Sequence, residues 1–523
     1  MMRFRASVAP MSEEIPVLII GGSLVGLTTA ALLGHHGVPS LSVERHAGTA
    51  IHPRAGHFQL RTMEILRQLG LEDAARETSL RTYHPSGGIN AVESLAGREL
   101  AVYIADVNEG IEGYSPTHRL FLDQDALEPL LRERALELGA TLRNRVEAVG
   151  HEEDADGVTV TLRDLDAGSE STVRAQYVVA ADGNRSPTRN RLGIGMEGYG
   201  LLSRSVTIYF RADCGPLLQD RNQGVIYVHN PTLRGFFRLN RSGGKGFLVV
   251  TTVGADVTTE EAVNVVDGMD DARARELLAT AIGADMPMEV LDVAHWQAEA
   301  NVATRFAEGR VFLAGDAAHV VPPNGGFGGN TGVQDAHNLA WKLAAVVKGD
   351  AGPALLDTYD AERRPLGRMT IEQAYTRYAT RVVPERGTED VEPPIDDLTI
   401  EIGTLVHSTA VVPEPGDGGA VVEHPSTSRG RPGSRAPHVP VGDGSTLDLL
   451  GAGFVLLVGP DGGDVVVDGV TTQRVDAPGF ADAYGIGPAG ASLVRPDGIV
   501  AWRSRTAPDA AEVAAVLDRV LSR

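Results

Sequence analysis

The segment Pro16–Glu44 (PVLIIGGSLVGLTTAALLGHHGVPSLSVE) constrains the possible folds more strongly than any other part of this chain. A continuous apolar run over Val17–Ile20 leads into a glycine-rich turn, after which apolar residues recur at helical spacing. A second apolar run then ends at Glu44. This succession of strand, tight turn, helix and strand predicts a βαβ unit in a parallel sheet, the kind of unit whose turn approaches a dinucleotide.

The turn itself is a variant of the dinucleotide fingerprint G-x-G-x-x-G, in which Ser23 takes the place of the second glycine. In that fingerprint the glycines make the turn, let the pyrophosphate approach the backbone and let the helix pack against the strand. Ser23 is small enough to fit, and its hydroxyl can hydrogen-bond a phosphate. A carboxylate at Glu44 binds ribose hydroxyls and favours FAD or NAD over NADP. The residues expected to bind this half of the cofactor are Gly21, Gly22, Ser23, Gly26, Glu44 and Arg45.

A second glycine-rich segment follows much later in the chain, in VFLAGDAAHVVPPNGGFGGNTGVQDAHNLAWKL (Val311–Leu343). An apolar strand ends at Gly315-Asp316, and the loop after it holds five glycines between Gly325 and Gly332. Because ordering glycines costs backbone entropy, we expect a ligand to approach the backbone here. Asp316 is placed to hydrogen-bond a polyhydroxyl chain, and the free N–H groups of the following helix can face an electron-rich cofactor edge.

Three motifs together carry a resemblance to a known family. These motifs are the first glycine turn, Asp182-Gly183 in VVAADGNRSPTR, and Gly315-Asp316 with the loop after it. In the same order they resemble the flavoprotein aromatic hydroxylases, the group of para-hydroxybenzoate and phenol hydroxylases, over about residues 1–380. The segment YGIGPAGASLVRPDGIVAWR is similar to the thioredoxin-like C-terminal domain of phenol hydroxylase and of aklavinone-hydroxylase-like enzymes. Since Cys214 is the only cysteine, this domain lacks a CxxC pair and is expected to be structural.

The resemblance implies roles for residues that match the family's motifs. Arg54 and Gln124 are expected beside the pyrophosphate and flavin, and Asp316 on the ribityl chain. The Asp182-Gly183 motif is expected to serve both FAD and NADPH handling. The residues expected to flank the isoalloxazine ring are Pro322, Gly328, Gly329 and Asn330. Tyr227 aligns with a tyrosine that contacts substrate in similar enzymes, and core packing is the alternative role for it. Tyr227 and Arg54, which is expected beside the flavin, are the residues assigned to the reaction.

The function implied is that of an FAD-dependent monooxygenase, with NADPH or NADH as reductant and O2 as oxidant. It would hydroxylate an electron-rich aromatic through a flavin C4a-hydroperoxide. The substrate would be a phenol, a hydroxy-heteroarene or a polyketide-derived aromatic, in the biosynthesis of a natural product such as an antibiotic. Two alternatives stay open: a Baeyer–Villiger oxygenase on the same fold, and a flavoprotein that binds without catalysing.

The expected fold class is α/β, with a Rossmann-like FAD-binding domain, an inserted β-sheet substrate domain and a thioredoxin-like C-terminal domain. The predicted boundaries are a tail at 1–15, the FAD-binding domain at 16–200 and 290–385, the substrate domain at 201–289, a linker at 386–440 and the C-terminal domain at 441–523.

Composition excludes several other kinds of partner. The net charge is −22 and aromatic residues make up only 5%, which argues against nucleic acid and anionic membranes. No apolar run is long enough for a transmembrane helix, and the first fifteen residues lack the apolar core of a signal peptide, so Met11 is an alternative start. We expect a cytoplasmic enzyme without a metal site, and a homo-oligomer, a dimer or larger, stays open.

Other residues that attract attention have plainer interpretations. His52, His57 and His319 resemble catalytic bases but are interpreted as surface or pocket-lining residues. Trp296 and Trp341 are interpreted as core residues.

Overall fold

The structure is a computed structural model that describes residues 13–52, 54–219, 221, 224–251, 268–383, 389, 391–415 and 418–523. The alternative start at Met11 lies outside these residues. The first strand, β1 (Glu13–Ile20), begins inside the segment predicted as an N-terminal tail. Within the described ranges, no helix has the length and hydrophobicity needed to cross a membrane.

A largely parallel sheet forms the body of the molecule, with the strand order β16-β17-β10-β1-β2-β7 and with β8 and β9 extending from β10. Strand β1 pairs in parallel with β2 on one side and with β10 on the other, so the predicted βαβ unit is present. The bounds of the remaining strands are β2 (Ser40–Glu44), β7 (Thr141–Asn144), β8 (Val146–Glu153), β9 (Val158–Asp164), β10 (Glu170–Ala180), β16 (Ala307–Glu308) and β17 (Val311–Leu313).

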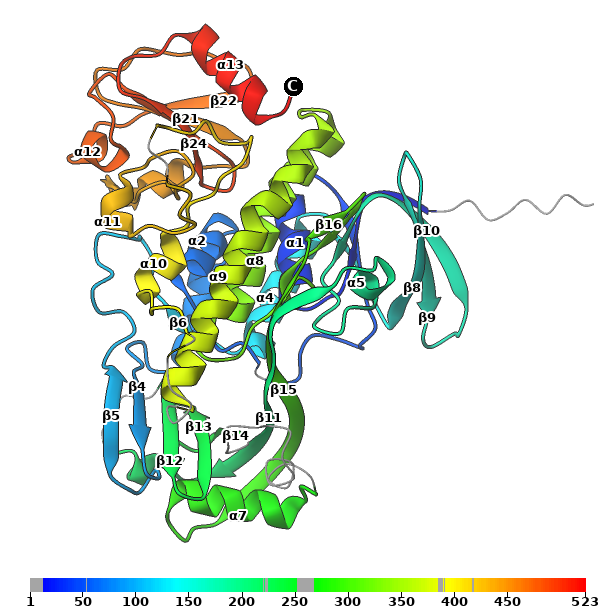
Figure 1. Cartoon of the computed structure of the whole chain (residues 1–523), viewed down its shortest axis with the longest axis vertical. Helices are drawn as coiled ribbons and strands as arrows, with labels where there is room; N and C mark the ends of the chain where they lie inside the picture. The colour runs from blue at the N-terminus through cyan, green and yellow to red at the C-terminus, as the bar shows by residue number, and fades with distance from the viewer. Residues whose placement is uncertain are drawn as a thin grey trace, which may run out of the picture.

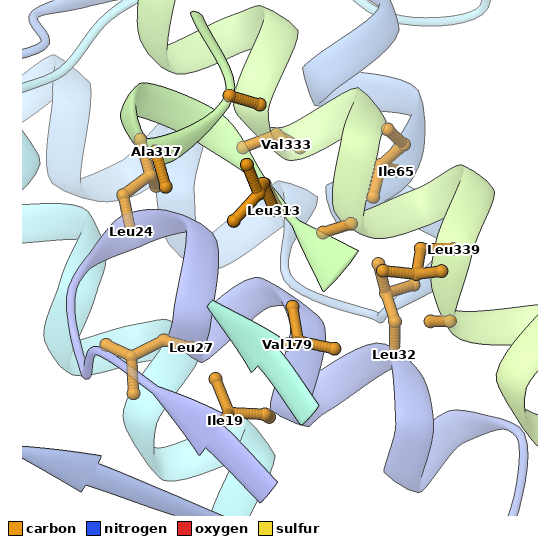
Figure 2. Close-up of a cluster of buried hydrophobic side chains, with 14 of the residues drawn as sticks. Ile19, Leu24, Leu27, Leu32, Ile65, Val179, Leu313, Ala317, Val333 and Leu339 are labelled. Carbon is orange, nitrogen blue, oxygen red and sulfur yellow. The ribbon is translucent and has the colours of Figure 1, made fainter. Parts of the chain in front are cut away.

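The core beside this sheet explains how the first glycine turn is held in place. Helix α1 (Leu24–His35) is apolar on nearly all sides because it lies buried in the main core, in contact with helix α8 (Phe327–Lys348). Figure 2 shows side chains of the sheet, of α1 and of α8 meeting in this core, among them Ile19, Leu27 and Val333. This packing fixes the N-termini of both helices close to the ends of the strands.

A second sheet has the order β18-β15-β11-β14-β13-β12-β4-β5. The bounds of its strands are β4 (Ile89–Val92), β5 (Glu99–Ile104), β11 (Met196–Ala212), β12 (Val225–Asn230), β13 (Leu233–Leu239), β14 (Lys245–Thr251), β15 (Met288–Ala303) and β18 (His319–Val320). Two of its strands, β4 and β5, come from well before the predicted insertion at 201–289, and β12 joins β4 in parallel. Local sequence patterns do not show such pairing between distant segments, which is why the prediction missed these two strands.

The two faces of the second sheet differ in chemistry because side chains alternate along each strand. One face packs Val206, Ile208 and Phe210 of β11 against helix α7 (Asp271–Ile282). The other face carries polar and aromatic residues, such as Thr207 of the same strand. Figure 1 shows α7 lying on the outer side of this sheet, away from the body of the molecule.

The C-terminal part forms a four-stranded sheet of order β22-β21-β23-β24, with the hairpin predicted at Pro496-Asp497-Gly498 between β23 and β24. Its elements are β21 (Phe454–Val458), β22 (Val470–Arg474), α12 (Phe480–Tyr484), β23 (Ala491–Val494), β24 (Val500–Ser504) and α13 (Ala510–Val520). Trp341 of α8 is 2% exposed and packs in this core, with its ring against Phe454, so its interpretation as a core residue is confirmed. The thioredoxin-like character of the domain stays a prediction.

Further helices connect these parts of the molecule. Figure 1 shows α8 and α9 running side by side through its centre, between the second sheet and the C-terminal sheet. The remaining elements used below are β3 (His57–Phe58), α2 (Leu60–Gln68), β6 (Leu120–Phe121), α3 (Glu72–Thr82), α4 (Gln124–Glu137), α5 (Pro187–Arg191), α9 (Thr358–Arg381), α10 (Asp397–Ile402) and α11 (Pro425–Ser428). Helices α10 and α11 lie inside the predicted linker, and Ile400 and Ile402 are buried, so that segment packs on the body rather than spanning a gap.

Candidate active site

The first glycine turn leaves no room for side chains at two of its glycines. Gly21 has a φ of +114°, and a Cβ there would lie 2.2 Å from the carbonyl oxygen of Ala181. A Cβ on Gly26 would lie 1.9 Å from the carbonyl oxygen of Gly21. Helix α1 therefore begins as close to the strand as the backbone allows, which is the role of the first and third glycines in the fingerprint.

Glu44 lies at the mouth of a cavity beside this turn. The cavity encloses about 240 Å³ and is lined by residues that include Gly22, Ser42, Glu44, Thr49, Arg132 and Asn144. The carboxylate of Glu44 accepts a hydrogen bond from the Gly22 backbone N–H (2.8 Å), which fixes its orientation toward the turn. The neighbouring Arg45 is exposed. The structure brings Gly22 and Glu44 together, and their role in cofactor binding stays a prediction, as does that of Arg45.

A carboxylate that the sequence reasoning missed organises the same turn. Glu128 of α4 is fully buried, and its Oε1 accepts hydrogen bonds from the Ser23 hydroxyl (2.5 Å), the Leu24 N–H (2.9 Å) and the Gln124 side chain (2.7 Å). Its Oε2 accepts a hydrogen bond from the N–H of Ala50 (2.6 Å). A signal was available, because Gln124 and Glu128 stand four residues apart on one face of a helix.

Gln124 also ties the turn to the segment that contains Arg54. Its Oε1 accepts a hydrogen bond from the Ala55 N–H (3.2 Å), and its Nε2 donates to the Ser23 hydroxyl (2.9 Å). Arg54 itself is exposed, and its charge influences both Asp316 and Tyr209. The structure therefore brings Arg54 and Gln124 to the space between the first glycine turn and the second.

Asp316 stands just beyond the buried end of β17. Its side chain is exposed while Gly315 and Ala317 are buried, and among the described residues its carboxylate has no hydrogen-bond or ion-pair partner. The surrounding protein removes water from the carboxyl group of Asp316 and raises its pKa, an effect that His319 and Arg54 partly offset. An uncommitted carboxylate in such a place is suited to accept hydrogen bonds from a ligand.

A buried ion network holds the turn that carries Asp316. Asp335 of α8 accepts hydrogen bonds from the Gly315 N–H (3.0 Å), His319 Nε2 (2.6 Å) and Arg363 Nε (2.8 Å). His319 is completely buried, so its interpretation as a surface or pocket-lining residue is wrong. The reason is that the partner, Asp335, lies on the following helix, where no local pattern links it to the histidine.

The second glycine loop lets α8 start close to the first unit. Gly326 has a left-handed φ of +68° and caps α8, and a Cβ on Gly332 would lie 2.5 Å from Val25 Cγ2. The first turn of α8 contains no acidic residue, and its cap makes no side-chain hydrogen bond. Its first N–H groups, at Gly328 and Gly329, are therefore available to a ligand.

Asn330 and Pro322 are buried parts of this loop rather than open contacts. The Asn330 side chain accepts from Gln59 N–H (3.0 Å) and Thr62 hydroxyl (2.7 Å), and donates to the carbonyls of His57 (2.9 Å) and Gly326 (2.7 Å). All four of its hydrogen-bonding positions are thus used within the protein, so only its backbone is left for a cofactor.

The Asp182-Gly183 motif folds into a tight loop beside the Asp316 turn. Asp182 accepts a hydrogen bond from the Thr188 N–H (3.0 Å), so its carboxylate helps to hold the start of the short helix α5. Gly183 has a left-handed φ of +83°. Arg189 of α5 donates to the carbonyl oxygen of Ala317 (2.9 Å), which joins this motif to the Asp316 turn.

A second cavity of about 380 Å³ lies between the inner face of the second sheet and the second glycine loop. Its lining includes Ser203, Tyr227, His229, Arg234, Phe236, Trp296, Asn324 and Tyr378. Tyr227 is 7% exposed, and burial raises the pKa of its hydroxyl, although Arg381 and Asn324 lie against it and partly offset this effect. Tyr227 thus stands in a pocket wall, a position that agrees with a contact to substrate.

Trp296 differs in part from its interpretation as a core residue, whereas His52 and His57 are both partly exposed. Trp296 packs against the main core but also lines the cavity, and its Nε1 donates to Thr207 Oγ1 (2.9 Å), so it is more than a core residue. His52 is half-exposed and stacks on Tyr209 at 4.5 Å. Burial lowers the pKa of His57 to about 3, which leaves that ring neutral at physiological pH.

Comparison with known proteins decides the family. The FAD binding domain family matches residues 14–374, and the C-terminal domain of aromatic-ring hydroxylases matches residues 429–523. The chain is an FAD-dependent aromatic-ring hydroxylase.

Full-length relatives agree with this assignment. The hydroxylase is 54% identical over 531 residues to a 4-methyl-5-nitrocatechol 5-monooxygenase of a Burkholderia species, with 97% of each chain covered. It is 38% identical over 560 residues to tetracenomycin A2 monooxygenase-dioxygenase of Streptomyces glaucescens, with 98% of each covered. A crystal structure of aklavinone-11 hydroxylase with FAD and aklavinone matches with a TM-score of 0.90 at 37% identity, over 98% of this chain and 100% of that chain.

The predictions of family, α/β fold class, monooxygenase activity and FAD as cofactor are therefore confirmed. The hydroxylase uses O2, and NAD(P)H is the reductant typical of the family. Its own residues fit FAD as well. The first turn excludes side chains at Gly21 and Gly26, α8 offers uncapped N–H groups, and Asp316 is an uncommitted carboxylate between them.

Proposed function

We propose that the hydroxylase acts on a small electron-rich phenol or catechol bound in the cavity beside Tyr227. The lining of the cavity carries this proposal, because aromatic side chains such as Phe236 and Trp296 surround a few polar groups, among them the hydroxyl of Tyr227, as in ligand pockets. The similarity to an enzyme named for a nitrocatechol, at 54% identity, supports the same substrate class. A polyketide-derived aromatic in antibiotic biosynthesis is the second candidate, supported by relatives such as the tetracenomycin enzyme.

For the cofactor we propose an extended site between the two glycine turns. The cavity lined by Glu44 would take the adenosine, with Arg45 at its rim, and Gly21, Gly22, Ser23 and Gly26 would face the pyrophosphate. Asp316 would accept hydrogen bonds from the ribityl chain. The α8 backbone from Gly328 to Asn330 would face the isoalloxazine, with Pro322 behind it. Arg54 and Gln124 would close the site from the opposite side, and Asp182-Gly183 would support the Asp316 turn.

Bound there, FAD would accept electrons from NAD(P)H and activate O2 for transfer to a ring. The chain's own residues would orient the substrate, exclude water and balance charge. Tyr227 is the side chain proposed to hold the substrate hydroxyl, since it stands in the pocket wall with its own hydroxyl against Arg381 and Asn324. Arg54, exposed beside Asp316, is proposed to provide positive charge near the reacting centre.

Product analysis tests this function. Phenols, catechols, hydroxypyridines and polycyclic quinones are offered with NADPH or NADH, and both cofactor oxidation and product mass are recorded. We expect ring hydroxylation of a small phenol or catechol. An ester product would instead identify Baeyer–Villiger chemistry, and FAD binding without any NAD(P)H consumption would identify a non-catalytic flavoprotein.

Substrate is expected to accelerate reduction of the flavin. The chain carries a single dinucleotide fingerprint, which suggests that NAD(P)H docks transiently and that a bound substrate promotes the necessary movement. Stopped-flow absorbance of the holoenzyme under anaerobic conditions measures the reduction rate with and without substrate. Equal rates in the two cases would refute this gating.

Replacing Tyr227 with phenylalanine is expected to uncouple the reaction. The change removes one hydrogen bond of about 0.5–1.5 kcal/mol, so substrate binding should weaken from a few-fold to about tenfold. A loosely held ring misses the activated oxygen, because small misplacements at a reacting centre are costly. We therefore expect NAD(P)H consumption to persist while product falls and H2O2 rises.

Tyr209→Phe provides the matched control for this experiment, since Tyr209 lies on the same sheet but does not line the cavity. Native coupling and native substrate affinity in Tyr227→Phe would show that Tyr227 is only a packing residue.

A further inference from the structure

The hairpin of the C-terminal domain inserts a buried arginine into the helices of the FAD-binding domain. Arg495 follows β23 directly and its side chain is completely buried. Its Nη1 and Nη2 donate to the two carboxylate oxygens of Glu362 on α9, at 2.7 Å and 2.9 Å. Its Nε donates to Asp497 of the same hairpin at 2.9 Å. A bidentate pair of this kind fixes both the distance and the direction between its partners.

Helix α8 joins the same cluster from the other side. Lys342 is fully buried and donates to Glu362 (2.9 Å) and to the side-chain amide oxygen of Asn338 (2.8 Å). Asn338 donates in turn to Glu362 (2.6 Å) and Asp497 (3.2 Å). The cluster holds two positive and two negative charges, so it is balanced as long as all four are present. Removing one partner would leave an uncompensated charge in the interior.

The hairpin also contacts helix α2, which packs against α8. The backbone carbonyl of Asp497 accepts a hydrogen bond from Arg61 (2.5 Å), and that of Pro496 accepts one from Gln68 (3.2 Å). Near their N-termini α2 and α8 meet at Asn330, whose side-chain oxygen accepts a hydrogen bond from the Thr62 hydroxyl. The hairpin thus contacts α2 from Arg61, beside the junction with α8, to Gln68 at the C-terminus of α2.

A continuous series of buried contacts leads from this cluster to Asp316. Glu362 is followed in α9 by Arg363, which donates to Asp335 (2.8 Å) and to the Thr331 carbonyl (3.2 Å). Asp335 accepts from the Gly315 N–H, and Gly315 precedes Asp316. Two consecutive residues of α9 therefore have different partners. Glu362 pairs with Arg495 of the C-terminal domain, and Arg363 pairs with Asp335, which holds the turn that carries Asp316.

We propose that Arg495 is a positioning residue of the flavin site, and that the C-terminal domain serves this hydroxylase as a clamp on α8 and α9. Apolar packing alone would be enough to join the C-terminal domain to α8 and α9. The four charges of the cluster are balanced only when the helices lie in one position relative to the hairpin, so the cluster also fixes that position. The inference rests on the proposed place of FAD between Asp316 and the first turn of α8. It requires no redox chemistry from the C-terminal domain.

The test compares Arg495→Met with Arg503→Met in the full-length protein. Arg503 is a fitting control because it belongs to the same hairpin and pairs with Glu414 at 2.7 Å, away from α8 and α9. Both variants should lower the unfolding temperature. Apoprotein is titrated with FAD at a temperature where circular dichroism shows every variant folded. We expect the FAD dissociation constant to rise at least tenfold in Arg495→Met and to stay within twofold of wild type in Arg503→Met.

Arg495→Lys keeps the positive charge but cannot form the bidentate pair with Glu362. It replaces Arg495→Met in the FAD titration if Arg495→Met does not fold. We expect a three- to tenfold rise in its FAD dissociation constant. Wild-type FAD affinity in the folded Arg495 variants, together with a lowered unfolding temperature, would overturn the proposal and leave the cluster a purely stabilising role. Because FAD affinity is measured without substrate, this result is independent of whether the enzyme hydroxylates a phenol.

Discussion

Replacing Glu128 with alanine is expected to destabilise the protein and to weaken FAD binding together. The change removes the acceptor of four hydrogen bonds and leaves the N–H groups of Leu24 and Ala50 without their partner. Each buried donor that loses its acceptor costs about 1–3 kcal/mol, so two or more such donors give about 2–6 kcal/mol of lost stability. Since these donors shape the first glycine turn, FAD affinity should fall at least about tenfold, a change equivalent to about 1.4 kcal/mol.

Urea denaturation of the apoprotein and FAD titration measure these two effects separately. Glu133→Ala is the matched control, because Glu133 lies on the same helix but is exposed. We expect Glu128→Gln to have a stability and an FAD affinity between those of the wild type and Glu128→Ala. Its amide oxygen can still accept hydrogen bonds, but its NH2 group faces donors that need an acceptor. If Glu128→Ala matched the wild type in both measurements, the carboxylate would have no role in shaping the turn.

Replacing Asp316 with alanine is expected to lower FAD affinity by about ten- to a hundredfold. The side chain of Asp316 is exposed and its carboxylate has no partner among the described residues, so its removal should disturb the apoprotein little. A hydrogen bond to a charged group contributes about 1.5–3 kcal/mol, which corresponds to that range of affinity. We therefore expect a loss of FAD affinity without a matching loss of apoprotein stability. Replacing a purely structural residue would lower the apoprotein stability as well.

Fluorescence titration of apoprotein with FAD measures this effect, and Asp350→Ala, at the exposed far end of α8, controls for the loss of one acidic residue. An Asp316→Ala protein that purifies with a full complement of FAD and unchanged affinity would remove Asp316 from the site.

Features encoded by short stretches of sequence could be predicted. The βαβ unit followed from the change of apolar spacing around the turn, and the steric role of Gly21 and Gly26 followed from the fingerprint. Asp316 could be singled out because it lies where an apolar strand ends, suited to hydrogen-bond a polyhydroxyl chain, and its role in binding FAD stays a prediction. The hairpin at Pro496-Asp497-Gly498 followed from its turn residues.

Features that depend on distant segments could not be predicted in this way. Strand β4 enters the second sheet through parallel pairing with β12, and nothing local marks that partnership. His319 is buried only because Asp335 and Arg363 come from two other elements. Trp296 lines a cavity because β15 belongs to the second sheet, which forms one wall of that cavity. The residue type alone favours a core position, so the sequence did not indicate the cavity. In each case the deciding contact joins residues that a local pattern cannot associate.

Oxygen incorporation tests most directly whether this protein transfers one atom of O2 to an aromatic ring with electrons from NAD(P)H. The holoenzyme is incubated with NADPH or NADH, isotopically labelled O2 and 4-methyl-5-nitrocatechol, alongside the wider panel of phenols and quinones. We expect one labelled oxygen on a ring carbon of a small phenol or catechol for each molecule of reductant consumed. Oxidation of NAD(P)H with no label in any product, or label found only in an inserted ester oxygen, would contradict hydroxylation.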